Sequence, residues 1–328
     1  MTTVLSAATD EGGTLPVIDV TNPAFRVSVT DADLDAMCDR FVRDSTRQRH
    51  VPAFAYRLLV RSFLQRSTLG RGLLAATGSF LGGLDTYLLK IGPENLPGWA
   101  TDADRRIAES FPAFATRLRL QDMAELLAEG MEDRLRAEPS RRLLLINIAG
   151  GPAADSLNAL MLLHREAPAL LKRDVRIVVL DLDERGPAFG ARALEALRAP
   201  DAPLSGLEIA FERIDYRWSD ARRLSEILER AQAHASICGV SSEGGLFEYG
   251  SDDDIVANLE ALRAGTPAGT IMVGSVTRDG EPVRLTQVAN RVPTRPRTLE
   301  AFQRLVEQSG WHLERVRARP FSYNVGLT

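Results

Sequence analysis

Apolar residues follow two different patterns in the two parts of the chain. Between residues 30 and 136 they recur at helical spacing, which is typical of amphipathic helices. One such stripe consists of Leu118, Met123, Leu126, Leu127 and Met131. After residue 140, short apolar runs of strand length alternate with helical patterns. The change occurs at Glu138-Pro139-Ser140 and predicts a boundary between an all-helical part and an α/β part.

A segment with little pattern precedes the helical part. Residues 1–29 contain Pro16, Pro23 and the pair Gly12-Gly13, so we expect extended or loose structure there. Residues 30–139 are predicted to form an all-helical domain. Its first helix is expected to start at Thr30, and further helices are expected over residues 52–65, 101–111 and 112–136. Short helices are expected between residues 70 and 90, where glycines interrupt the pattern.

The strand-like runs after residue 140 predict a doubly wound sheet. They cover residues 143–148, 175–182, 207–214, 235–240, 270–276, 313–318 and 321–326. Strands that alternate with helices form parallel sheets covered on both faces. Only Arg319-Pro320 separates the last two runs, which is too short for a crossover and predicts an antiparallel hairpin. The predicted fold class is therefore α/β, with a mostly parallel seven-stranded sheet over residues 140–328 that ends in an antiparallel hairpin.

Composition and charge exclude several classes of function. The chain has 328 residues and a net charge of −4, so we expect neither nucleic acid nor a membrane surface as partner. Its two cysteines are too few for a metal site or a disulfide framework, and they fit a reducing compartment. Residues 1–13 lack the features of a signal peptide, and no apolar run approaches the roughly 20 residues that span a bilayer. We therefore expect a cytoplasmic protein without a metal.

The most informative stretch is the first strand together with the turn that follows it. An apolar strand ends in Gly150, Gly151 and Pro152, and a helical pattern begins at Ala153. The N–H groups of such a helix start point into the crevice beyond the strand, where they suit an anionic or polar ligand group. The glycines have no side chains to block a ligand, and a proline in the first helical turn needs no N–H.

Residues 146–153, Ile-Asn-Ile-Ala-Gly-Gly-Pro-Ala, resemble motif I of the class I S-adenosylmethionine (SAM)-dependent methyltransferases. That motif has the form hydrophobic-acid-hydrophobic-Gly-x-Gly-x-Gly. Here Asn147 stands in place of the acid and alanines 149 and 153 replace the outer glycines, whereas the middle glycine is kept. The terminal hairpin also resembles this fold, whose seventh strand inserts antiparallel beside the fifth. The resemblance implies SAM as cofactor, S-adenosylhomocysteine as product, and cofactor contacts from Asn147, Ala149, Gly150, Gly151 and Pro152.

Two acids at the ends of later strands extend the resemblance. Asp181 ends the second strand, where a carboxylate can accept both ribose hydroxyls, and Asp183 is its alternative. Leu182 lies between them and is a further implied contact. In the family an acid at the end of the third strand, here Asp215, faces the adenine amino group, and Tyr216 would flank the base. The alternative interpretation of both acids is a surface turn or a helix cap.

The loop after the fourth strand faces the methyl group in the resembling fold. It runs from Ser241 through Glu243 and two glycines to Tyr249. We expect Ser241 to contact the cofactor, Glu243 to orient or deprotonate an acceptor, and Tyr249 to position that acceptor. The alternative is a loop that only connects the strand to the next helix. His50, the one histidine of the helical part, is a further catalytic candidate, with a structural role as its alternative.

We interpret the chain as a SAM-dependent methyltransferase that acts on a small-molecule acceptor. The helical part is expected to form a lid that supplies the acceptor pocket, because small uncharged acceptors need an enclosed apolar site. Its candidate lining residues are aromatic: Phe54, Tyr56, Phe63, Phe80 and Tyr87. An accessory or dimerisation role is the alternative for these helices, which leaves a homodimer open.

Two other functions fit parts of the same sequence. Ala149-x-Gly151-x-x-Ala154 resembles an altered dinucleotide fingerprint, which indicates an NAD(P)-dependent oxidoreductase. Asn147 and the missing glycines indicate instead a SAM-binding protein without catalysis and with a regulatory role. The sequence shows no strong catalytic constellation. That fits methyl transfer, because the sulfonium methyl group is already activated and the protein mainly aligns the reactants.

Overall fold

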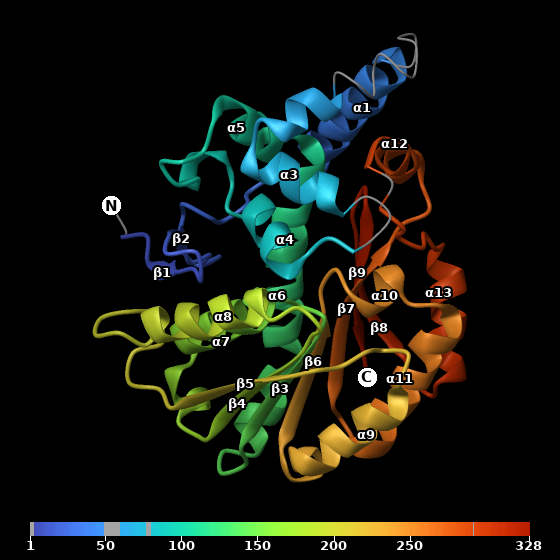
Figure 1. Ribbon diagram of the computed structural model, residues 1–328. Helices are drawn as coiled ribbons and strands as arrows, with labels where there is room; N and C mark the ends of the chain where they lie inside the picture. The colour runs from blue at the N-terminus through green and yellow to red at the C-terminus, as the bar shows by residue number, and fades with distance from the viewer. Residues whose placement is uncertain (1–2, 49–59, 77–79, 291) are drawn as a thin grey trace.

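The computed structural model describes residues 3–48, 60–76, 80–290 and 292–328 (Figure 1). At its centre is a seven-stranded sheet with the strand order β5-β4-β3-β6-β7-β9-β8. The strands are β3 Leu143–Ile148, β4 Val175–Leu180, β5 Ile209–Ile214, β6 Ile237–Ser242, β7 Ile271–Thr277, β8 Leu313–Ala318 and β9 Ser322–Leu327. All strand runs predicted after residue 140 are present.

The strands from β5 to β7 pair in parallel, and β9 pairs antiparallel with both β7 and β8. Asn147 of β3 lies in register with Val179 of β4 and with Ser241 of β6. The carboxyl ends of these three central strands therefore meet at one edge. The predicted fold class, a mostly parallel α/β sheet that ends in an antiparallel hairpin, is confirmed.

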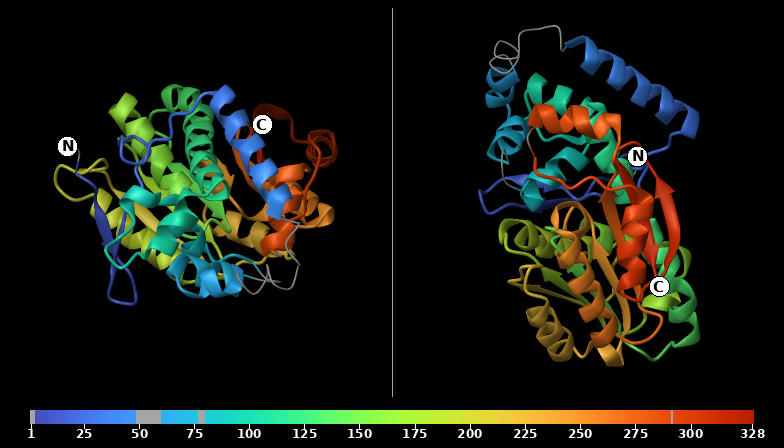
Figure 2. Two further views of the ribbon diagram at one scale, coloured as in Figure 1. Left: turned by 90° about the horizontal axis from the view of Figure 1, so that it is seen from above. Right: turned by 90° about the vertical axis from the view of Figure 1, so that its right-hand side faces the viewer.

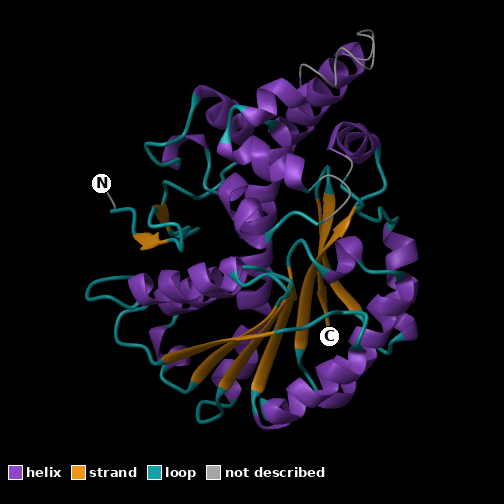
Figure 3. Cartoon of the chain, viewed as in Figure 1, coloured by secondary structure: helices purple, strands orange, loops and turns teal. Residues whose placement is uncertain are grey.

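Helices cover both faces of the sheet (Figures 1 and 3). They are α6 Phe111–Ala137, α7 Ala154–Glu166 and α8 Arg185–Leu197 on one face, and α9 Ala221–Arg230, α11 Asp252–Gly265 and α13 Leu299–Gln308 on the other. Leu143 and Leu145 of β3 belong to the first core, whereas Leu144, Ile146 and Ile148 belong to the second. Successive side chains of a strand point to opposite faces, so a strand covered twice is apolar almost throughout.

The N-terminal half supplies helices that stand over the carboxyl ends of the strands (Figure 1). In the described residues of this half, the α-helices before α6 are α1 Asp31–Gln48, α3 Thr68–Ala75, α4 Gly83–Lys90 and α5 Asp102–Glu109. Two short helices lie in the C-terminal half, α10 Leu246–Tyr249 and α12 Glu281–Asn290, and α12 packs against α1. At the start of α5, Thr101 and Asp104 form a capping box, and Asp104 also accepts from Leu69 N at 2.9 Å. This last bond joins α5 to α3.

The first segment of the chain is extended, but it is packed rather than loose. Strands β1 (Ser6–Ala8) and β2 (Thr14–Pro16) form an antiparallel hairpin. Val17, Ile18 and Val20 then lie in the core. Asn158 of α7 fixes this stretch, since its Oδ1 accepts from Val20 N at 2.7 Å and its Nδ2 donates to Ile18 O at 3.0 Å. The apolar side chains from residue 15 to residue 20 explain the packing, because they are buried in the same core as those of α7 and α8.

Helix α6 belongs to the core of the sheet, although its sequence lies in the region predicted as the helical domain. It packs against β6, β7, β9 and α7 (Figure 2). A Cβ on Gly130 would lie 1.7 Å from Ile271 Cδ1, and a Cβ on Gly239 would lie 2.4 Å from Met131 Sδ. The helix therefore approaches the sheet as closely as glycine allows. In the described part of the chain, every helix is too short or too polar to cross a membrane.

Candidate functional site

A cavity of about 510 Å³ lies between helices α3 and α4 and the carboxyl ends of the central strands. The helical side contributes Gly72, Ala75, Ala76, Phe80, Thr86 and Lys90, and the sheet side contributes Ala149, Gly150, Asp181, Leu182, Tyr216, Glu243 and Tyr249. Its volume falls in the range of about 300–1,000 Å³ that is usual for small-molecule sites. The chain crosses from β3 to β4 on one side and reaches β6 on the other, and open α/β sheets bind ligands at such a switch point.

The turn after β3 has the backbone of a glycine-rich turn although two of its residues are alanines. The φ angles of Ala149, Gly151 and Ala153 are 56°, 54° and 53°. A left-handed conformation costs a residue with a Cβ about 1–2 kcal/mol. Two hydrogen bonds hold it here: Ala149 N donates to Leu180 O at 2.8 Å, and Ala153 N donates to Gly150 O at 3.1 Å.

Gly151 faces helix α4 rather than the cavity. A Cβ on Gly151 would lie 2.7 Å from Gly83 Cα, and a Cβ on Gly186 of α8 would lie 2.8 Å from Gly151 Cα. Three glycines thus let α4, the turn and α8 approach one another backbone to backbone. Gly151 N also donates to Asp181 Oδ2 at 2.9 Å, which ties the turn to the end of β4.

We expect Gly151→Ala to destabilise the fold by about 1–3 kcal/mol more than Gly206→Ala, because the added methyl group must displace the backbone of α4. Gly206 is a matched control, since it also has a positive φ but no atom lies within 4 Å of the place that its Cβ would take. Urea unfolding of both variants measures the difference. Equal losses of stability in the two variants would mean that the positive φ alone causes them and that α4 can move away from the turn at little cost.

Asp181 follows β4 directly and lines the cavity. Its Oδ2 accepts from Gly151 N and its Oδ1 accepts from Asp183 N, each at 2.9 Å. Burial raises the pKa of this carboxyl, and the two backbone bonds offset part of that effect. Each carboxylate oxygen keeps a second lone pair, so both can still accept a bond from a ligand. The structure therefore holds a pair of oriented acceptors in the cavity.

The end of β5 places Tyr216 in the cavity lining and Asp215 at the surface. The Asp215 side chain is 73% exposed and pairs with Arg213. The Tyr216 hydroxyl donates to Asn258 Oδ1, and Asn258 Nδ2 donates to Trp218 O at 2.6 Å. These two bonds anchor the loop after β5 to helix α11. Tyr216 and Trp218 line the cavity, whereas Asp215, for which the sequence predicted a ligand contact, lies outside the lining with its carboxylate paired to Arg213.

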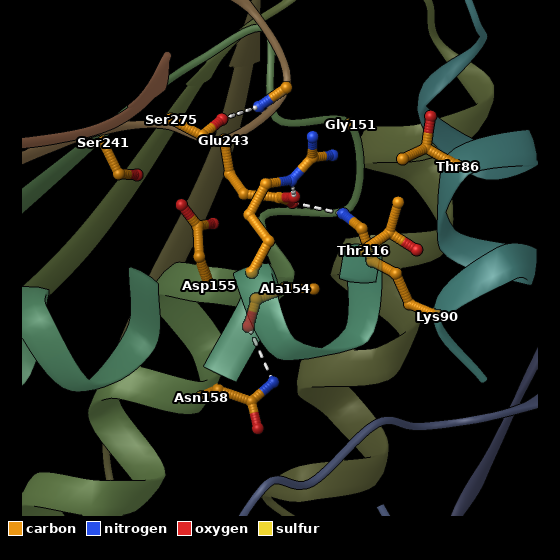
Figure 4. Close-up of polar contacts among 12 residues, drawn as sticks. Thr86, Lys90, Thr116, Gly151, Ala154, Asp155, Asn158, Ser241, Glu243 and Ser275 are labelled. Carbon is orange, nitrogen blue, oxygen red and sulfur yellow. Dashed lines mark hydrogen bonds and ion pairs between the residues drawn. The ribbon is translucent and has the colours of Figure 1, made fainter. Parts of the chain in front are cut away.

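Four charged side chains form a connected set of ion pairs, and two of them, Lys90 and Glu243, line the cavity. Figure 4 shows Lys90 beside Glu243. Glu243 pairs with Lys90 of α4 and, through Oε1, with Arg119 Nε of α6 at 2.6 Å. Arg119 also pairs with Glu248 of α10 at 2.7 Å. The side chains of Lys90 and Glu243 are only 6% and 3% exposed. We call Lys90, Arg119, Glu243 and Glu248 the buried charge cluster.

The buried charge cluster keeps Glu243 ionised. Burial by itself raises the pKa of this carboxyl, but Lys90 and Arg119 together bring it below its ordinary value. Pairing with two cations makes this carboxylate a weaker base, which bears on the prediction that Glu243 orients or deprotonates an acceptor. On α7 nearby, burial and the charge of Glu243 raise the pKa of Asp155, which accepts from Asn147 Nδ2 at 2.6 Å. The pKa values of these two neighbouring acids are therefore shifted in opposite directions, that of Asp155 upward and that of Glu243 downward.

Phe80 lines the cavity and contacts two loops at the carboxyl edge of the sheet. Its ring makes edge contacts with Trp218, at 5.4 Å between centroids, and with Tyr249, at 5.0 Å. Trp218 follows β5 and Tyr249 belongs to α10, so the helical half meets both loops here. Burial, with a smaller contribution from Glu248, raises the pKa of Tyr249. Tyr249 is therefore a neutral phenol in the cavity wall.

Five further residues predicted for the site lie outside the cavity lining: Asn147, Ser241, Pro152, Tyr87 and Phe63. Asn147 and Ser241 are fully buried below the turn, where Asn147 Nδ2 donates to Ser241 Oγ at 3.0 Å. Pro152 packs between α4 and α8. Tyr87 donates to Pro16 O at 2.8 Å and fastens the N-terminal segment. Phe63 packs against the core, whereas His50, Phe54 and Tyr56 lie outside the described residues.

Comparison with solved structures finds proteins of similar architecture. The chain is similar to a possible exported protein from Bordetella parapertussis, with a TM-score of 0.54 and 18% identity over 92% of this chain and 97% of that one. It is also similar to an O-methyltransferase from neocarzinostatin biosynthesis, with a TM-score of 0.41 and 16% identity over 68% and 58% of the two chains. For the mitomycin 7-O-methyltransferase the values are 0.43 and 15%, over 84% and 73%. No protein-family model matches the chain, and no curated protein matches it significantly.

The chain has the class I methyltransferase fold. The strand order, the antiparallel β9 between β7 and β8, and the turn after the first strand of the sheet all agree with the resemblance in the sequence. The Bordetella protein shares this architecture over nearly its whole length, including the N-terminal half. At 18% identity this similarity concerns the fold alone.

Proposed function

We propose that the protein binds SAM in this cavity and transfers a methyl group to a small-molecule acceptor. The observation that supports this most directly is that the turn after β3 and the Asp181 carboxylate share one cavity. The two ribose hydroxyls of a nucleoside are adjacent donors, and Asp181 offers two oxygens whose directions are fixed by Gly151 N and Asp183 N. The residues present therefore fit a nucleoside-containing cofactor.

Each part of SAM has a suitable partner in the lining. Asp181 would bind the ribose hydroxyls, Tyr216 and Leu182 would flank the adenine, and Ala149 and Gly150 leave room beside the ribose. When bound, SAM supplies an electrophilic methyl group on a sulfonium. The protein's part is to hold an acceptor in line with that group and to exclude water.

We infer that helices α3 and α4, together with Phe80, form the acceptor side of the cavity. Gly72, Ala75 and Ala76 give this side small apolar surfaces, and Tyr249 offers a neutral hydroxyl opposite them. These features suit the positioning of a small acceptor. The predicted lid function of the helical half is proposed for α3 and α4 only, since α6 packs in the core of the sheet.

The antiparallel β9 favours this function over an NAD(P)-dependent oxidoreductase, whose sheet usually continues in parallel. A thermal-shift experiment separates the two: S-adenosylhomocysteine should raise the melting temperature, and NAD or NADP should not. Methyl transfer from labelled SAM to candidate acceptors would then separate a transferase from a protein that only binds SAM.

We expect Asp181→Asn to weaken S-adenosylhomocysteine binding about 10- to 100-fold, because it removes a charge-assisted pair of hydrogen bonds. Asp215→Asn is the matched control and should change the affinity by less than about twofold, since that carboxylate is at the surface and outside the cavity lining. Isothermal titration calorimetry measures both. A folded Asp181→Asn variant with unchanged affinity would remove Asp181 from the cofactor site.

A further inference from the structure

The strand order determines which residues an elongated ligand in the cavity would meet, and in which order. Strands β5, β4, β3 and β6 lie side by side in the sheet. Their carboxyl ends carry, in the same order, Tyr216, Asp181, the glycine turn and Glu243. A nucleoside with its base beside Tyr216 and its ribose on Asp181 therefore extends across the turn toward β6. The far end of such a ligand meets Glu243 and its partner Lys90.

Lys90 and Glu243 are equipped to bind that far end. Both line the cavity, and they pair with each other as members of the buried charge cluster (Figure 4). An ammonium carries three donors, and the contact with Glu243 uses one of them. Each oxygen of Glu243 accepts one bond, from Lys90 or from Arg119, and has a second lone pair. Both groups can therefore form hydrogen bonds with a ligand while their own ion pair stays intact.

We propose that Lys90 and Glu243 together bind the zwitterionic amino-acid tail of SAM, Lys90 its α-carboxylate and Glu243 its α-ammonium. This inference rests on the proposed function. A zwitterion brings one charge of each sign, so every charge at the floor of the cavity stays paired after binding, as burial requires. Asn147 on β3 is neutral and turned toward Asp155 and Ser241, so the negative charge comes from the neighbouring strand end instead.

The test compares two ligands that differ in this tail. S-adenosylhomocysteine carries the amino-acid tail, whereas 5′-methylthioadenosine has a methyl group in its place. Titration of the full-length protein should show that S-adenosylhomocysteine binds at least about 100-fold more tightly. In Lys90→Met that preference should fall by about tenfold or more, while the affinity for 5′-methylthioadenosine changes by less than about threefold. Lys90→Arg, which keeps the charge, should retain most of the preference.

The outcomes separate this inference from the proposed function. Equal losses for both ligands in Lys90→Met would overturn the inference, because they would show a structural role, and so would a wild-type protein that binds the two ligands equally. A wild-type protein that binds neither ligand would overturn the proposed function as well. If Lys90→Met does not fold, the Lys90→Met/Glu243→Gln double variant provides the same comparison, since it leaves Arg119 paired with Glu248.

Discussion

A chain that begins at Ser140 is expected not to fold, because it lacks helix α6. That helix buries Leu120, Met123, Leu127, Met131 and Leu135 against the sheet and α7. Loss of one such side chain costs about 2–5 kcal/mol, and the whole stability of a typical protein is about 5–15 kcal/mol. The cost of losing all five side chains exceeds the whole stability of a typical protein, so the remaining contacts cannot keep the shortened chain folded. Circular dichroism during heating and size-exclusion chromatography should show a soluble aggregate or no cooperative transition.

A chain that begins at Thr101 is the matched control for this truncation. It keeps the capping box of α5 and all of α6, but it lacks α3, α4 and the N-terminal segment. We expect it to melt cooperatively, at a lower temperature than the full chain. If the chain from Ser140 also melts cooperatively and binds S-adenosylhomocysteine, the boundary at residues 139–140 separates two independent domains and α6 is dispensable.

We expect Arg119→Met to destabilise the fold by about 3–5 kcal/mol, the usual effect of removing one partner from a buried ion pair. Arg119 is the cation that joins Glu243 to Glu248, and its side chain is 13% exposed. Without it, Glu248 keeps a hydrogen bond from Ser275 but has no cation beside it in the buried charge cluster. Urea unfolding of the variant and the wild-type protein measures the difference.

Two further variants test this explanation. Arg223→Met removes an exposed ion pair with Glu226 and should cost less than about 1 kcal/mol. Adding Glu248→Gln to Arg119→Met should recover part of the lost stability, because it removes the uncompensated charge. The loss of unfolding free energy in the double variant could instead equal the sum of the losses in the two single variants. In that case the effect of Arg119 comes from packing rather than from charge.

The sheet could be predicted from the sequence because burial on both faces leaves a continuous apolar run, as in Leu143–Ile148. The terminal hairpin followed from the short gap of Arg319-Pro320 between the two predicted runs, and the observed strands are likewise separated by only three residues, 319–321. Strands β1 and β2 have three residues each, too few to show a period of two, and they escaped prediction. Helix α12, Glu281–Asn290, was also not predicted.

The strand-end positions of the site could be predicted because parallel strands bring their carboxyl ends to one edge. Ala149, Asp181 and Tyr216 line the cavity for this reason. Lys90 and Arg119 could not be found in this way, because they reach Glu243 from 153 and 124 residues away in sequence. In the sequence each is one basic residue in a helical pattern. Their burial arises only when α4 and α6 pack against the sheet.

The left-handed conformations of Ala149 and Ala153 bear on how distant relatives of this fold can be recognised. Glycine adopts such dihedral angles without a steric penalty, whereas here two methyl groups are tolerated because hydrogen bonds to Leu180 and Gly150 hold the turn. The dihedral angles of the turn are thus kept where its glycines are lost. A comparison by residue identity scores each alanine as a mismatch, while a comparison by backbone conformation scores it as a match. Other chains with alanines at these two positions can therefore share the backbone conformation of this turn at identities too low for sequence comparison to detect.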